Sequence, residues 1–378
     1  MAEPLKAMYN ESFLQAFGHK VKKAYEAFDE AAFLRLALGE GWETLELKQR
    51  MRRITESLRA TLPEDYEQAL DVLESIAEQC RGFPYLFFPD FVEKYGLNHW
   101  VRSLAALKKF TPMSSSEFAV RPFIKRDPER MMAQMLEWSV HPDEHVRRLA
   151  SEGCRPRLPW ADALPALKRD PAPILPILER LKADGAEYVR RSVANNLNDI
   201  SKDHPELVLK LAKAWQGLGP GTDWIIRHAC RGLLKAANPE AMALFGIVPQ
   251  EGLEVTEWSL SESVIAIGES VSFRYGVRVA APGEVKLRIE LAVYFPRSTG
   301  KQYRKLFKLT EKAVACEADV QGGRSFSFAD LSTRKHYPGV HRMALVVNGR
   351  EVAHAELELL AASASGGGAR QAERGAQA

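Results

Sequence analysis

Three acidic residues in the middle of the chain are candidates for chemistry, because each lies near an arginine that follows a hydrophobic residue. They are Glu117, Glu152 and Asp199. A carboxylate can stabilise a positive charge that develops during a reaction, and it can orient or deprotonate an attacking water molecule. Trp160 follows Glu152 by eight residues, and the face of an indole ring attracts a cation. Together these side chains could support hydrolysis of a bond whose leaving group is positively charged.

The arginines near these acids recur at a regular spacing. The step from Arg147 to Arg190 is 43 residues, and the step from Arg190 to Arg227 is 37 residues. These steps bracket the period of two-helix HEAT-type repeats, and stacked repeats place equivalent positions on one face. We therefore expect a cationic row along a concave surface that contacts the phosphates of a nucleic acid. The row lies in the segments Val146-Arg147-Arg148, Val189-Arg190-Arg191 and Ile226-Arg227-His228.

Acids are unexpected on a surface that only holds phosphates, because carboxylates weaken the electrostatic attraction that supplies most of the affinity. Their presence beside the arginines indicates a second positive charge that they must meet. An alkylated base such as 3-methyladenine is cationic, and its departure leaves an oxocarbenium-like sugar, as in glycoside hydrolysis. The combination therefore favours a surface that both holds nucleic acid and promotes cleavage of a glycosidic bond.

The elements that position these residues are predicted to be helices. Apolar residues recur at helical period up to Ile247. Prolines at first-turn positions mark helix starts, and they predict the first helices of three repeats over residues 128–140, 173–183 and 205–216. Each of these helices leads through a short turn into the helix that carries the arginines. We therefore predict an all-α HEAT-like helical solenoid over residues 1–250.

The pattern changes after Gly252 to short runs of alternating, β-branched residues. These runs predict strands over residues 254–258, 271–279, 285–295, 304–309, 343–347 and 352–359. Asn348-Gly349, between the last two runs, suits the positive dihedral angles of a two-residue hairpin turn. We predict an all-β immunoglobulin-like sandwich over residues 253–360. Residues 361–378 contain no bulky apolar side chain and are predicted to be a disordered tail.

Composition narrows the class of protein. Of the 378 residues, 46% are hydrophobic and 27% are charged, which suits a multidomain globular protein. No apolar run reaches the roughly 18 residues that a membrane span needs, and the N-terminus lacks an export signal, so we expect a cytoplasmic protein. The four cysteines lack metal-ligand spacing, so we expect no metal, no cofactor and no disulfide. A net charge of +3 is too small to indicate a nucleic-acid partner without local clustering.

Three runs of sequence resemble one known family. Residues 117–123, 146–160 and 189–205 are similar to the AlkC branch of bacterial alkylpurine DNA glycosylases, which are relatives of AlkD. The resemblance extends over roughly residues 5–247. It implies a base excision repair enzyme, a hydrolase that removes cationic N3-alkylated bases, including 3-methyladenine and 3-methylcytosine, from double-stranded DNA. It also implies that the base is not flipped into a pocket, unlike the usual glycosylase strategy.

By motif position, the resemblance assigns catalytic roles to Glu117, Glu152 and Asp199, with Trp160 as their aromatic partner. The carboxylates would stabilise the oxocarbenium-like sugar and position the attacking water. Longer members of the family continue into an Ig-like module that helps to encircle the duplex, and this chain resembles the longer form. We therefore expect a monomer that binds alkylated double-stranded DNA.

The residues expected to contact DNA have cationic or polar side chains on the repeat helices, in the loop after Glu152, or in a basic stretch of the β region. In that loop, two arginines beside prolines are expected to prop a distorted duplex. In the β region, four basic residues surround a Ser-Thr-Gly turn. The complete set is Arg121, Arg147, Arg148, Arg155, Arg157, Arg190, Arg191, Asn195, Lys202, Arg227, Arg297, Lys301, Arg304 and Lys305.

Each assignment has a structural alternative. An arginine on a repeat helix often forms a structural ion pair, and Glu152 could pair with Arg148 four residues earlier. Asp199 could cap a turn, Glu117 could belong to an N-terminal capping pattern, and Trp160 could be a packing residue. A non-enzymatic HEAT-type scaffold or damaged-DNA-binding protein is therefore the alternative function. The sequence leaves open which alkylated base is preferred and which carboxylate positions the water.

Overall fold

The computed structural model of the chain describes residues 4–280, 283–297, 302–315, 317–331 and 334–362. The chain divides into two compact units, Met1–Cys230 and Arg231–Ala378. Nearly all of the predicted tail lies outside the described residues, and so does Lys301. In the described part of the chain, no helix combines the length and the apolar character needed to pass through a bilayer.

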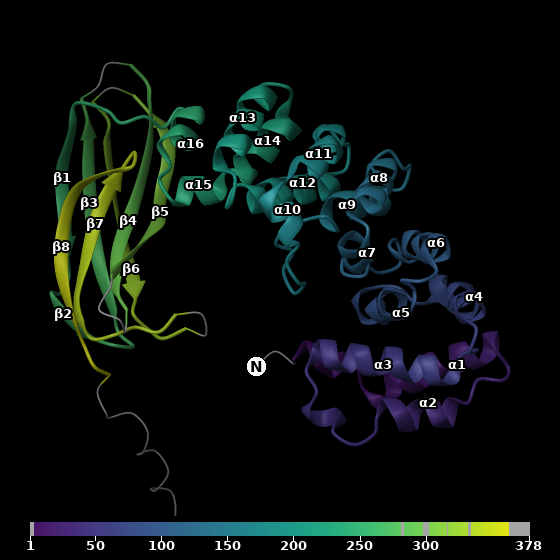
Figure 1. The fold of residues 1–378 in the computed structure, drawn as a ribbon. Helices are drawn as coiled ribbons and strands as arrows, with labels where there is room; N and C mark the ends of the chain where they lie inside the picture. Colours follow the sequence, from purple (N-terminus) through teal and green to yellow (C-terminus); the bar gives the residue numbers. More distant parts are fainter. Residues whose placement is uncertain (1–3, 281–282, 298–301, 316, 332–333, 363–378) are drawn as a thin grey trace, which may run out of the picture. The chain divides into compact units, whose positions relative to one another are not determined.

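Met1–Cys230 consists of helices that stack in two layers along an arc (Figure 1). Its helices are α1 (Glu11–Ala24), α2 (Glu30–Ala37), α3 (Leu47–Thr61), α4 (Tyr66–Ile76), α5 (Phe87–Tyr95), α6 (Trp100–Phe110), α7 (Arg121–Arg126), α8 (Pro128–Trp138), α9 (Glu144–Glu152), α10 (Pro165–Arg169), α11 (Leu175–Leu181), α12 (Glu187–Ile200), α13 (Pro205–Trp215) and α14 (Pro220–Ala229). In one layer α3 packs against α5, and α12 packs against both α9 and α14. The predicted all-α region is therefore confirmed.

The two helices that carry most of the predicted site are formed for clear local reasons. α9 begins after Asp143, whose side chain accepts a hydrogen bond from the backbone N–H of His145 and so satisfies a donor of the first turn. α12 buries an apolar stripe that includes Val189, Val193 and Ile200, spaced so that the three side chains lie on one face. Because such stripes pack against neighbouring helices, α9 and α12 lie side by side, and polar residues of the two helices come into contact.

Prolines begin several helices as predicted. α8 starts at Pro128 and α13 starts at Pro205. The helix predicted over residues 173–183 is shorter in the structure, because Ala172–Ile174 forms a 3-10 turn and α11 begins only after it. Pro176 explains the difference: it has no N–H group with which to extend α-helical hydrogen bonding back into that turn.

Arg231–Ala378 contains the helices α15 (Arg231–Lys235) and α16 (Pro239–Leu244) and two β-sheets that face each other (Figure 1). One sheet has the strand order β1-β3-β6, and the other has the order β2-β8-β7-β4-β5. The strands are β1 (Leu253–Leu260), β2 (Val264–Ala266), β3 (Ser270–Val279), β4 (Val285–Pro296), β5 (Gln302–Val314), β6 (Asp319–Ser327), β7 (Gly339–Val347) and β8 (Arg350–Leu360). Phe273, Leu291 and Met343 belong to the core of this unit. The predicted β-sandwich is confirmed.

The sandwich contains two strands, β2 and β6, that the alternating pattern did not predict. β6 has a glycine pair where a strand pattern expects side chains, and the structure shows why. A Cβ atom at Gly322 would lie 2.5 Å from the hydroxyl oxygen of Tyr275, whose ring crosses the strand, so this position has no room for a side chain. The hairpin predicted at Asn348-Gly349 is confirmed, with φ angles of 45° and 82° between β7 and β8.

Candidate functional site

The structure brings two of the predicted catalytic acids to one buried arginine. Glu152 is the last residue of α9, and Asp199 is the penultimate residue of α12. Arg155 donates from Nη1 to Glu152 Oε1 at 2.6 Å and from Nε to Asp199 Oδ2 at 2.9 Å. The exposed fractions of the three residues are 5%, 2% and 7% for Glu152, Asp199 and Arg155. Side chains from two repeats therefore form one buried cluster.

The third predicted acid joins this cluster through Arg148. Arg148 Nη1 donates to Glu117 Oε2 at 2.6 Å, and Nη2 lies 3.7 Å from Glu152 Oε1. The guanidinium carbon lies 4.7 Å from the centre of the Tyr188 ring, where the π-electrons attract a cation. Acids and arginines thus alternate through the structure. We call Glu117, Arg148, Glu152, Arg155 and Asp199 the carboxylate–arginine network.

The network compensates its own charges. Burial alone lowers the pKa of Arg155, but the neighbouring Glu152 and Asp199 outweigh burial, so the pKa is raised above its ordinary value. Burial also opposes the charge of Arg148, and Glu117 and Glu152 again outweigh it and raise the pKa. Both guanidinium groups therefore remain charged at neutral pH. Such pairing is required because an isolated buried charge is costly.

Two serines and a lysine complete the contacts of the acids. Ser192 Oγ donates to Glu152 Oε2 at 2.6 Å, and Lys202 Nζ donates to Asp199 Oδ1 at 3.0 Å. Ser115 donates in the same way to Glu117. Sequence reasoning missed both serines, although Ser192 lies 40 residues after Glu152, about one repeat. The repeat period is the signal that could have found it.

The first arginine of each pair has a structural role. Arg147 forms a two-bond ion pair with Asp184, at 2.6 and 3.0 Å, and its Nη1 also donates to the carbonyls of residues 141 and 142. Arg190 Nη1 donates to the carbonyls of Asp184 and Gly185. In both cases the accepting carbonyls lie six and five residues before the arginine. These contacts fix the turns between helices, and the predicted row of phosphate contacts at Arg147 and Arg190 stays a prediction.

The last residues of the three basic segments have different surroundings. Arg148, Arg191 and His228 keep the spacing of 43 and 37 residues. Arg148 belongs to the network, and Arg191 has a side chain that is 62% exposed beside Glu187. His228 stacks on Trp224, with ring centres 4.9 Å apart. Of these three residues, Arg148 is the one that contacts the predicted acids.

The remaining polar residues predicted on this surface differ in their surroundings. Asn195 Oδ1 lies 3.3 Å from His228 Nε2, which joins α12 to α14. Arg227 is half-buried, with a buried Nη1. Arg157 forms a two-bond ion pair with Asp203 on the partly exposed side of the loop after α9. A role for these residues in DNA binding stays a prediction.

The loop of residues 153–162 carries Trp160 and is fixed from inside by Arg121. Arg121 is 3% exposed, and its guanidinium donates to the carbonyls of Gly153, Arg155 and Asp162. Burial lowers its pKa to about 10. Arg121 thus holds this loop from inside through backbone carbonyls, and the DNA contacts predicted for Arg121 and Arg155 stay predictions.

Trp160 lies in a turn outside the helices and is 59% exposed. The centre of its ring lies 6.3 Å from the centre of the Phe83 ring, in an edge-to-face arrangement. Its backbone is left-handed, with φ of 64°, a conformation that side-chain-bearing residues rarely adopt. A large exposed aromatic residue on strained backbone is typical of a functional position rather than of packing.

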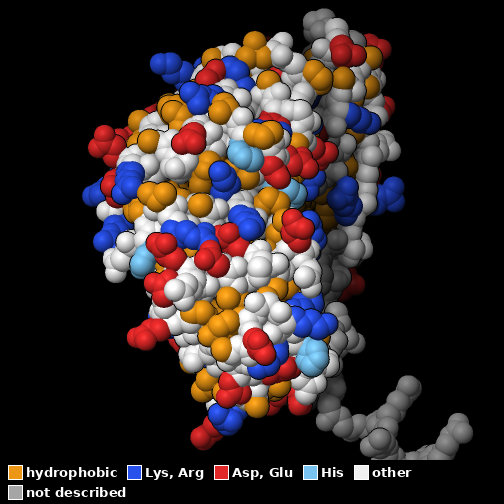
Figure 2. Space-filling view, turned by 90° about the vertical axis from the view of Figure 1, so that its right-hand side faces the viewer, with side chains coloured by type: hydrophobic (Ala, Val, Ile, Leu, Met, Phe, Trp, Pro, Cys, Tyr) orange, Lys and Arg blue, Asp and Glu red, His pale blue; other side chains and the backbone are white. Residues whose placement is uncertain are grey.

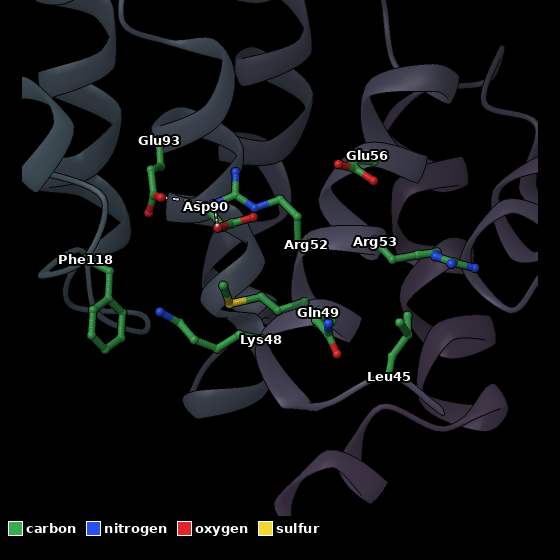
Figure 3. A pocket seen from close by; sticks show the side chains of 10 residues that line it. Leu45, Lys48, Gln49, Arg52, Arg53, Glu56, Asp90, Glu93 and Phe118 are labelled. Carbon is green, nitrogen blue, oxygen red and sulfur yellow. Dashed lines mark hydrogen bonds and ion pairs between the residues drawn. The ribbon is translucent and has the colours of Figure 1, made fainter. Parts of the chain in front are cut away.

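A pocket of about 380 Å³ lies next to this loop, between α3, α5 and Phe118 (Figure 3). Arg52 Nη2 lies 2.9 Å from Asp90 Oδ1 and 3.0 Å from Glu93 Oε1. Burial raises the pKa of the Asp90 carboxyl to about 6. Lys48 extends along the pocket toward the ring of Phe118. The acids and bases of the pocket are balanced, so it does not have the excess positive charge of a phosphate site.

Surface charge on the outer layer is mixed. Figure 2 shows Lys and Arg side chains interspersed with Asp and Glu over the face of Met1–Cys230 on the side of α4 and α6. Interspersed charges give little attraction to a polyanion. The visible face is therefore not a strongly cationic surface.

In Arg231–Ala378 the predicted basic residues gather on an edge strand. Arg304 and Lys305 are exposed on β5, which pairs within its sheet only with β4. Arg304 Nε lies 3.6 Å from Glu351 Oε1. Arg297 is exposed, with its guanidinium 4.9 Å from the centre of the Tyr303 ring. The contact of these side chains with DNA stays a prediction.

Comparison with protein families gives a match in each region of the chain. Residues 41–233 match the family described as "DNA alkylation repair enzyme". Residues 254–361 match the family described as "Uncharacterised protein YhaZ, C-terminal Ig-like domain". The first match contains the whole carboxylate–arginine network and Trp160.

Two known proteins are similar to the chain over most of its length. The "Uncharacterized protein YhaZ" of Bacillus subtilis (strain 168) is 48% identical over 345 residues, which cover 91% of this chain and 96% of that protein. A solved structure of Pseudomonas fluorescens alkylpurine DNA glycosylase AlkC, bound to DNA containing an abasic site analog, is 42% identical. It covers 94% of this chain and 99% of that chain, with a TM-score of 0.90.

Proposed function

The chain belongs to the DNA alkylation repair enzyme family, in its AlkC-like form with a C-terminal YhaZ Ig-like domain, and from this we propose that it is a monofunctional DNA glycosylase. Its proposed substrates are cationic N3-alkylated bases, including 3-methyladenine and 3-methylcytosine, in duplex DNA. The observation that carries the proposal is the buried cluster in which Arg155 joins Glu152 to Asp199. The DNA-bound structure of AlkC supports it, because an abasic site is what base release leaves behind.

The proposed mechanism uses charges that are fixed before the reaction begins. As the glycosidic bond breaks, the sugar acquires oxocarbenium character, and the carboxylates of Glu152 and Asp199 stabilise this positive charge. Carboxylate oxygens have several lone pairs, so an oxygen that already accepts from Arg155 or Ser192 can still orient a water molecule. Because the arginine and the serine hold the acids in place, little reorganisation is needed in the transition state.

DNA would be held by cations outside the network. Arg191 lies on α12 and Lys202 lies in the turn that follows it, both with exposed side chains, and Arg304 and Lys305 lie on the edge strand β5. In this proposal Trp160 presents its ring to the cationic base, which leaves without being flipped into a pocket. The base departs as a neutral molecule, the oxygen of a water molecule bonds to the anomeric carbon of the sugar, and the proton that this water loses passes to a carboxylate and then to solvent.

The alternative is a damaged-DNA-binding protein without catalysis. It is favoured by the fact that all three acids already have cationic partners, as structural acids do. Incubation of the chain with duplex DNA containing 3-methylcytosine separates the two functions, with free base measured by chromatography. We expect time-dependent release of free base, whereas a binding protein would retain the intact duplex and release none.

A further inference from the structure

Lys48 contacts two segments that carry predicted site residues, namely the loop of Trp160 and the turn of Glu117. It lies 112 residues before Trp160, yet its Nζ donates to the Trp160 carbonyl at 2.5 Å. The same nitrogen lies 4.9 Å from the centre of the Phe118 ring, and Phe118 follows Glu117 directly. Figure 3 shows the Lys48 side chain directed at Phe118 along the edge of the pocket. One ammonium group therefore bridges the Trp160 loop and the Glu117 turn.

The position of Lys48 does not serve the stability of its own helix. Lys48 is in the first turn of α3, and no acidic residue is present in that turn. The N-terminus of a helix carries partial positive charge, so a cation there is unfavourable. Lys48 is also exposed, so its side chain contributes little to the hydrophobic core. The contacts with the two segments are therefore what this lysine provides.

The Trp160 backbone needs such an external contact. Its left-handed conformation (φ 64°) is strained for a residue with a side chain, and such strain persists only where the surroundings determine it. On one side the neighbouring carbonyl of Asp162 is held by Arg121. On the other side the carbonyl of Trp160 itself is held by Lys48. Lys48 therefore holds the backbone from which the indole ring projects, while Phe83 contacts the ring itself.

We propose that Lys48 is a positioning residue, which holds the Trp160 ring in the direction needed to meet the alkylated base. The proposal rests on the proposed glycosylase function. A misplacement of about 1 Å can cost 100-fold in rate, so a ring that is free to turn would slow base release. Lys48 would not need to touch the substrate to have this effect.

The test is the single-turnover release of 3-methylcytosine from duplex DNA by the full chain. Lys48→Met keeps most of the side-chain length and removes the ammonium group, and we expect the rate constant to fall at least about tenfold. The thermal unfolding midpoint should be unchanged or slightly raised, because a cation leaves the helix N-terminus. Lys48→Arg should restore most of the rate. Lys109→Met, which removes an exposed lysine paired with Glu74 at 3.1 Å, should leave the rate unchanged.

A second background shows whether Lys48 acts through Trp160. In the Trp160→Ala chain, Lys48→Met should change the rate less than about twofold, because the group that Lys48 positions is already absent. An equal loss in both backgrounds, or an equal loss of affinity for undamaged duplex, would overturn the proposal, since a lysine that only contacts phosphate behaves in this way. If the wild-type chain released no base, the proposed function would itself be wrong, and the positioning role would fall with it.

Discussion

Replacement of Arg155 by methionine should show how strongly the carboxylate–arginine network depends on one buried cation. The Arg155 side chain is 8% exposed, and it contacts Glu152 at 2.6 Å and Asp199 at 2.9 Å. Removal of one partner from a buried ion pair costs about 3–5 kcal/mol, because the other charge is left uncompensated. In this site Glu152 keeps Arg148 at 3.7 Å and Asp199 keeps Lys202 at 3.0 Å, so we expect a loss in the lower half of that range.

Arg157→Met is the matched control, since Arg157 lies two residues further along the same loop. Its ion pair with Asp203 joins side chains that are 35% and 27% exposed, and exposed pairs contribute at most about 1 kcal/mol. The free energy of unfolding, measured with urea by circular dichroism in the helical band, should therefore fall at least about 2 kcal/mol further for Arg155→Met than for the control.

Base release should respond to Arg155→Met for an electrostatic reason. Without the guanidinium, two adjacent carboxylates repel each other and one of them takes up a proton. The site then loses negative charge with which to stabilise the oxocarbenium-like sugar, so the rate should fall while binding of undamaged duplex is retained. A variant as stable and as active as Arg157→Met would refute the buried-network reasoning.

Three further predictions follow from the contacts of individual residues. Glu152→Gln and Asp199→Asn should each lower single-turnover base release at least about 100-fold, while affinity for an abasic duplex, measured by fluorescence anisotropy, changes far less. Arg191→Ala should weaken binding to damaged and undamaged duplex alike and flatten its salt dependence, whereas Arg190→Ala should chiefly lower the thermal midpoint. Burial lowers the pKa of His341, so folding favours the neutral form of this ring. Its stabilisation is present above the unfolded pKa of about 6.5 and is lost as pH falls toward the lowered pKa. The thermal midpoint of unfolding should therefore decrease as the pH is lowered below about 6.5, and the decrease should be smaller in His341→Asn.

The order of the regions and the identity of the acids were predictable from the sequence. Helical periodicity and the Asn348-Gly349 turn are local signals, and the structure confirms both. The repeat period could not tell Arg147 from Arg148, because both residues recur with the same spacing, and the structure shows that Arg148 contacts Glu117 and Glu152. Adjacent residues on a helix point about 100° apart, and only the packed repeats decide which of the two meets Glu152.

The remaining features depend on contacts between distant segments. Nothing in the sequence around Lys48 indicates a contact with Trp160, because the two residues meet only after several repeats have stacked. The burial of Arg121 was likewise hidden, since its hydrogen bonds go to backbone carbonyls that have no sequence signature. From the sequence alone, Gly322 in β6 indicates a turn, and only the structure shows that the ring of Tyr275 packs against it.

The most direct measurement is the release of free 3-methylcytosine from duplex DNA under single-turnover conditions, with wild type, Glu152→Gln and Lys109→Met compared in one experiment. If the carboxylate–arginine network performs the hydrolysis, wild type and Lys109→Met release base at the same rate and Glu152→Gln releases it far more slowly. Equal rates for all three proteins would contradict catalysis by the network. Tight binding of the duplex by wild type without any release would show a damaged-DNA-binding protein instead.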